Sequence, residues 1–174
     1  MKLKKSGALL AIMLMVPPAS QAGSFGDWFT GATDDGQLYA GSTNESGGML
    51  MKGCRPSSGI CYWYLVTSTA CESGVSAPAL FSTSEGAHSF NLRCDTAFKQ
   101  GGQVLYRSVI NDPDAMDQML TSKTPLGIAI ALKDGRFAVF RFSMAGAQRA
   151  VSILMQGAIK LNESNPRSTR DTTL

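Results

Sequence analysis

The sequence predicts an α+β protein, in which a mainly antiparallel β sheet or sandwich carries a short helix and a C-terminal helix packed on the sheet. From residue 23 to about residue 109 the chain is rich in Gly, Ser and Thr and has short apolar runs between turn signals, a pattern typical of strands. The second half has two apolar runs around a Lys-Asp-Gly-Arg turn, followed by a stretch with helical periodicity. We expect roughly seven to nine short strands.

The first half contains the candidate strand that we expect at the centre of the sheet, residues 61–67. Its residues alternate between two faces, Cys61, Trp63 and Leu65 on one and Tyr62, Tyr64 and Val66 on the other. Both faces are apolar or aromatic, which indicates a strand with neighbours on both sides. Weaker strand candidates, several of them next to Gly-containing turns, are residues 37–42, 49–52, 79–83, 89–93 and 104–109.

A short helix is predicted after residue 110. Asn111 or Asp112 can cap it, and Pro113, Asp114 and Asp117 fall in its first turn. Met116, Met119 and Leu120 then share one face. Asp112, Asp114 and Asp117 superficially resemble a calcium loop, but the pattern fails because an EF-hand needs Gly at the sixth position and Glu at the twelfth. We therefore expect the acids to stabilise the positive end of the helix dipole.

A hairpin and a helix end the predicted domain. Residues 126–132 and 137–142 flank the Lys133–Arg136 turn, and Gly127, Ala129 and Ala131 form a face of small residues that a helix could approach closely. One further helix is predicted up to about Lys160, because its apolar residues repeat at helical spacing: Ala147, Val151, Leu154, Met155 and Ala158. We expect this helix to cover the hairpin, with Leu154 as an anchor, and residues 162–174 to form a mobile polar tail.

Residues 1–22 read as a cleaved secretory signal peptide. Lys2, Lys4 and Lys5 precede an apolar run over residues 8–16, and Ser20 and Ala22 fit a cleavage site before Gly23. The run is too short for a permanent transmembrane anchor. We expect an exported protein, periplasmic or secreted, with a single domain over residues 23–161.

The charge of the mature chain argues against nucleic acid as a partner. Three of the 16 basic residues lie in the signal peptide and all 13 acidic residues lie after it, so the mature chain has equal numbers of both. A nucleic-acid surface would require a surplus or cluster of Lys and Arg.

The four cysteines, Cys54, Cys61, Cys71 and Cys94, predict two disulfides in an exported chain. No Cys-x-x-Cys spacing suggests a zinc or redox site. Three connectivities are open to four cysteines, and we favour Cys54–Cys61 with Cys71–Cys94 because residues 55–59 read as a tight loop.

Two further features bear on function. Tyr62, Trp63 and Tyr64 are a candidate ligand platform for a sugar or peptide, although aromatic residues are equally at home in the core of a β domain. His88 is the sole histidine, and no nucleophile motif accompanies it, so we expect a surface or loop residue. No catalytic residue, cofactor or metal site is predicted.

Short motifs at both ends resemble the bacterial invasion-associated locus B family. They are Phe25-Gly26-Asp27-Trp28 after the signal peptide, and Phe140-Arg141-Phe142-Ser143-Met144 leading into Ala145-Gly146 and a helix. The resemblance implies a disulfide-containing protein exported to the envelope, associated with host-cell entry or colonisation and not known as an enzyme. The chain departs from the family pattern in having no cysteine between residues 29 and 53.

These observations favour a non-catalytic exported binding protein with a protein or envelope partner. The alternatives are an inhibitor of an exogenous enzyme, such as a lysozyme or a protease, and a hydrolase. Small disulfide-bonded β proteins are natural scaffolds for inhibitors, whereas a hydrolase would need a nucleophile and base that no spacing in the sequence indicates.

Overall fold

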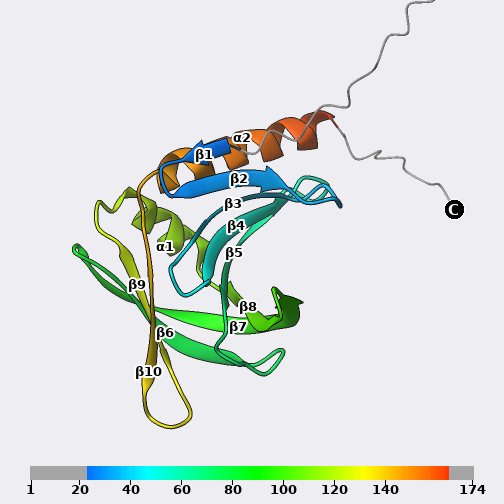
Figure 1. Ribbon diagram of the computed structural model, residues 1–174. Coiled ribbons are helices and arrows are strands. Elements are labelled where there is room, and N and C mark those ends of the chain that lie inside the picture. Colours follow the sequence, from blue (N-terminus) through cyan, green and yellow to red (C-terminus); the bar gives the residue numbers. More distant parts are fainter. Residues whose placement is uncertain (1–22, 165–174) are drawn as a thin grey trace, which may run out of the picture.

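The computed structural model describes residues 23–164, and within this range ten strands form one antiparallel sheet (Figure 1). The strands are β1 (Gly23–Phe25), β2 (Trp28–Ala32), β3 (Leu38–Thr43), β4 (Met49–Arg55), β5 (Ile60–Thr67), β6 (Ser76–Thr83), β7 (Gly86–Gln100), β8 (Gln103–Ile110), β9 (Leu126–Ala131) and β10 (Phe137–Phe142). Their spatial order is β1-β2-β3-β4-β5-β8-β7-β6-β9-β10. The predicted fold class is confirmed, with β5 inside the sheet as expected. The number of strands exceeds the predicted range because β1 and β2 were not foreseen.

The sheet bends so that its two halves share one core. The N-terminal half, β1–β5, and the C-terminal half, β6–β10, both contribute to a single apolar cluster (Figure 1). We call the face that points into this cluster the inner face and the opposite one the outer face. Cross-strand register places Thr30, Ala40, Lys52 and Trp63 in one row of the inner face. At the centre, Trp28 and Trp63 pack edge to face with ring centroids 6.1 Å apart.

The motifs near the two ends of the domain meet in space. The indole Nε1 of Trp28 donates to the carbonyl of Ser143 at 2.8 Å, and the backbone N–H of Asp27 donates to the carbonyl of Ala145 at 3.1 Å. Gly146 has a positive φ of 90°, and a Cβ there would collide with the backbone of Phe25. This contact joins the β1–β2 turn to the segment after β10.

Helix α2 (Ala147–Ser164) packs on β1 to β4, so the prediction that it covers the hairpin of residues 126–142 is wrong. Leu154 is a buried anchor as expected, at 3% exposure, but the helix that carries it packs on the N-terminal half of the sheet. The Met155 Sδ is 3.8 Å from Cys54 Sγ and 3.7 Å from Cys61 Sγ. The helix packs on β1 to β4 and not on the hairpin because the sharp turn at Gly146 starts it beside β1. The helix also runs beyond Lys160, through residues 162–164 of the predicted tail.

Helix α1 (Pro113–Gln118) continues into the 3-10 helix η1 (Met119–Thr121). Of the two predicted caps, Asp112 is the one used: its carboxylate caps α1 by accepting from the Ala115 N–H at 3.0 Å. Asp117 lies at the end of α1 instead of its first turn. It accepts from Lys52 Nζ at 2.7 and 2.6 Å and from Trp63 Nε1 at 2.8 Å. This carboxylate therefore pairs the buried Lys52 and fixes α1 to the inner face.

The predicted signal peptide, residues 1–22, and residues 165–174 of the predicted tail lie outside the described residues. Across residues 23–164, neither helix is long and apolar enough to cross a membrane.

Candidate functional site

Two disulfides cross-link the sheet with the connectivity that the tight-loop reasoning favoured. Cys54–Cys61 joins directly opposed residues of β4 and β5. Cys71–Cys94 joins the loop between β5 and β6 to the inner face of β7. All four cysteines of the chain are used, so none is free for catalysis or metal binding.

The structure separates the three members of the predicted aromatic platform. Trp63 lies on the inner face, is fully buried and donates its indole N–H to Asp117. Tyr62 and Tyr64 lie on the outer face, with 42% of Tyr62 exposed and the ring centroids 6.3 Å apart. Trp63 is therefore a core residue, and only the two tyrosines are available to a ligand.

Three residues that the sequence did not single out join these tyrosines on the outer face, two from the N-terminal half and one from β8, the strand that pairs with β5. Phe29 of β2 and Tyr39 of β3 form an edge-to-face pair at 6.2 Å. The Arg107 guanidinium of β8 lies 4.9 Å from the Tyr64 ring centroid and donates from Nε to Asp95 at 2.8 Å. Burial raises the pKa of Tyr64, while Arg107 acts to lower it. We call Phe29, Tyr39, Tyr62, Tyr64 and Arg107 the aromatic face.

Glycines in the same strands make room for the aromatic side chains. A Cβ on Gly31 would lie 2.5 Å from Tyr39 Oη, and a Cβ on Gly53 would lie 3.2 Å from Tyr64 Cε2. The tyrosines therefore lie across their neighbouring strands, a cross-strand arrangement that orders the rings on a rigid sheet. Tyr39 and Gly31 are paired across β2 and β3, a register that no local sequence pattern reveals.

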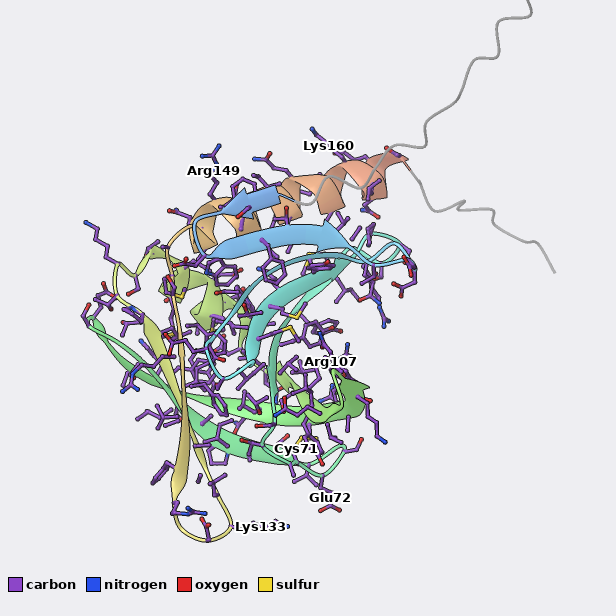
Figure 2. All side chains as sticks on the ribbon, viewed as in Figure 1. Cys71, Glu72, Arg107, Lys133, Arg149 and Lys160 are labelled. Atoms are coloured by element: carbon purple, nitrogen blue, oxygen red, sulfur yellow. A yellow bond between two sulfur atoms is a disulfide. The ribbon has the colours of Figure 1, made fainter. Side chains whose placement is uncertain are left out.

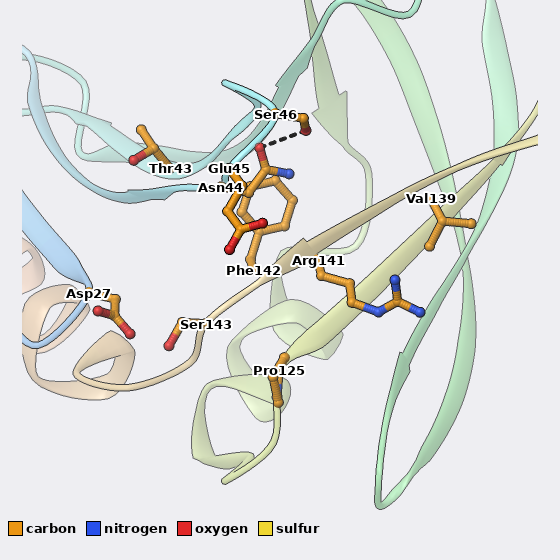
Figure 3. Close-up of a pocket in the computed structure, with 10 residues that line it drawn as sticks. All are labelled: Asp27, Thr43, Asn44, Glu45, Ser46, Pro125, Val139, Arg141, Phe142 and Ser143. Atoms are coloured by element: carbon orange, nitrogen blue, oxygen red, sulfur yellow. Dashed lines mark hydrogen bonds between the residues drawn. The ribbon is translucent and has the colours of Figure 1, made fainter.

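A polar cleft of about 680 Å³ lies between β10 and the turn after β3 (Figure 3). Asp27 and Glu45 bring carboxylates to it, Arg141 brings a guanidinium, and Asn44 accepts from the Ser46 hydroxyl at 2.9 Å. The cleft therefore contains both negatively and positively charged side chains, and β10, the last strand of the sheet, forms part of its wall.

An apolar groove of about 730 Å³ lies between the loop after β5 and the end of β9. Leu65, Leu92 and Ile130 form part of its wall, and Cys71, in the loop between β5 and β6, borders it. Cys71, Glu72 and Lys133 lie at this end of the molecule (Figure 2). The Cys71–Cys94 disulfide fixes the loop that borders the groove.

His88 is exposed, as expected, but it lies on β7 opposite Phe81 and not in a loop. The strand begins at Gly86, so the turn between β6 and β7 is shorter than the sequence suggested. His88 is not among the residues that line the polar cleft or the apolar groove.

The fold and its cross-links define a class of disulfide-bonded domain built on one bent antiparallel sheet. No protein-family profile matches the chain, and no curated protein matches it either. Among solved structures it is similar to the crystal structure of invasion associated protein B from Bartonella henselae. The identity is 13%, the TM-score is 0.55, and the match covers 79% of this chain and 97% of the other. This similarity shows a shared fold.

Proposed function

We propose that this protein is an exported, non-catalytic binding protein that holds a protein partner of the bacterial envelope or of a host on its aromatic face. The observation that carries the proposal is the gathering of Tyr62, Tyr64, Tyr39 and Arg107 on one rigid outer surface. Tyr and Arg are enriched among residues that dominate protein interfaces. Because the sheet already orders these side chains, binding would cost little conformational entropy.

Two further observations support the cellular setting of the proposal. Both disulfides suit an oxidising compartment such as the periplasm or the exterior, in line with the signal peptide expected at residues 1–22. The structural neighbour from Bartonella henselae carries the name invasion associated protein B, and we extend a role in envelope or host interaction from that protein to this one.

The test measures capture of a partner by the mature protein and by the variant Tyr62→Ala. Wild-type protein is cross-linked in envelope extracts and on host cells, the captured protein is identified by mass spectrometry, and its affinity is then measured with purified components. Tyr62→Ala should weaken binding by about 30-fold or more, since an interface hot spot is worth about 2 kcal/mol or more. Ile159→Ala is the matched control, because Ile159 is an exposed apolar residue on α2, 54% exposed.

Equal affinity of Tyr62→Ala and wild type would contradict the assignment to the aromatic face. Inhibition of a lysozyme or a protease by the wild-type protein at nanomolar concentration would instead favour the inhibitor alternative.

A further inference from the structure

The second feature with functional meaning is the open edge of the sheet at β10. This strand pairs with β9 on one side and ends the strand order on the other. At the start of the hairpin the Leu132 N–H donates to the Arg136 carbonyl, so Leu132 and Arg136 are a hydrogen-bonded residue pair. In an antiparallel pair, bonded and non-bonded residue pairs alternate, so the backbone groups of Phe137, Val139 and Arg141 point away from β9.

The side chains along this edge do not protect it. Phe137 is 65% exposed and Val139 is 52% exposed, both on the outer face. Residues 137–142 contain no proline and their register with β9 has no bulge, and Arg141 supplies the only charge in the strand. Proteins usually guard an edge strand with such devices, and an apolar, flat edge is a template for another strand.

We propose that two copies of this chain pair through their β10 strands, antiparallel and with Val139 on the two-fold axis. In this register the two Val139 residues exchange backbone hydrogen bonds, and Phe137 of each copy lies opposite Arg141 of the other. The ring and the guanidinium then form a cation–π pair twice. A register centred on Arg141 would oppose two like charges, which is unfavourable.

Charge complementarity beyond the strand favours the same partner. The turn between β9 and β10 carries Lys133, Asp134 and Arg136, all exposed. Asp134 pairs with Arg136 at 2.6 Å, so the turn keeps a net positive charge that comes from Lys133. In the proposed register this basic turn lies beside Ser143 of the other copy, where Asp27 and Glu45 line the polar cleft. Each copy therefore presents a net positive turn to a cleft that two carboxylates and one guanidinium line, and the contact is made twice, as a two-fold interface requires. The aromatic face is not part of this contact, so the dimer is independent of the proposed function.

The first test is the mass of the disulfide-intact mature protein, measured by sedimentation velocity and light scattering over a concentration series. The wild type should show a monomer–dimer equilibrium, and Val139→Lys should weaken it at least tenfold by placing two ammonium groups together on the axis. A wild type that stays monomeric up to hundreds of micromolar would overturn the proposal.

The second test places a single new thiol on the axis. Residues in a hydrogen-bonded antiparallel pair have Cα atoms about 5.5 Å apart, a distance that suits a disulfide. Val139→Cys should therefore form a covalent dimer under mild oxidation, with the two native disulfides checked by peptide mapping. Leu80→Cys is the control, because Leu80 is exposed on the same outer face but two strands from the edge. Equal cross-linking of both variants would show random collision and overturn the register.

Discussion

The outer faces of both halves of the sheet carry small residues, Gly or Ala, but the two halves differ in whether neighbouring side chains of the chain cover these residues. In the N-terminal half, Tyr39 covers Gly31 and Tyr64 covers Gly53, so the surface is filled by side chains of adjacent strands. In the C-terminal half, Ala129 and Ala131 of β9 are flanked by exposed apolar side chains of β6 and β10: Leu80, Phe137 and Val139.

The difference shows that small residues predict close approach without specifying the approaching group. In β2 and β4 the chain itself supplies that group, and the glycines are structural. In β9 the described chain supplies no covering element, because α2 packs on β1 to β4. The first surface is therefore an ordered face, on which we propose that a protein partner binds. The second ends at the edge of β10, where we propose that a second copy pairs.

The largest expected effect tests where α2 belongs. Leu154→Ala should lower the free energy of unfolding by about 2–5 kcal/mol, because it removes a buried side chain from the core between α2 and the N-terminal half. Denaturant melts of the disulfide-intact protein measure the loss. Ile159→Ala, on the exposed side of the same helix, should change it by less than about 0.5 kcal/mol. A similarly small loss at Leu154 would mean that α2 does not support this half.

Most elements of the fold are predictable from the sequence because their signals are local. The alternation in residues 61–67 correctly separated Trp63 from Tyr62 and Tyr64, and the Asp112 cap located α1. The strands β1 and β2 were missed because they are short and their apolar residues are interrupted by glycine. The cysteine pairing followed from a short loop, which is also local information.

Long-range contacts explain what sequence reasoning missed. Periodicity showed that α2 has an apolar stripe containing Leu154, but it did not identify the strands that the stripe would meet. That partner is set by the turn at Gly146 and its contact with Phe25, far away in the sequence. The aromatic face likewise depends on register between β2, β3, β5 and β8. The role of Asp117 depends on Lys52, 65 residues earlier.

A smaller effect tests whether the N-terminal glycines are structural. Gly31→Ala should destabilise the protein by about 1–3 kcal/mol, because its Cβ would crowd the Tyr39 ring. The measurement is again a denaturant melt. Ala131→Val, which also adds bulk on the outer face but at an exposed position, should stay within about 0.5 kcal/mol of wild type.

A double-mutant cycle isolates the cause of that loss. If crowding of Tyr39 is responsible, Gly31→Ala should cost little in a Tyr39→Ala background. A full loss in that background would assign the effect to the backbone and remove the contrast between the two outer faces.

The smallest expected effect concerns His88, which belongs to neither the aromatic face nor the edge of β10. His88→Ala should leave partner affinity, dimerisation and any turnover within a few-fold of wild type, because His88 lies outside both surfaces and lines neither the polar cleft nor the apolar groove. General acid–base catalysis by histidine contributes about 10²–10⁴-fold, well outside that range. The variant is first shown to melt like wild type and is then assayed for binding, for mass and against a panel of hydrolase substrates. A hundred-fold loss of turnover in the folded variant would show that function lies on neither outer surface, and would make β7 the place to look for an active site.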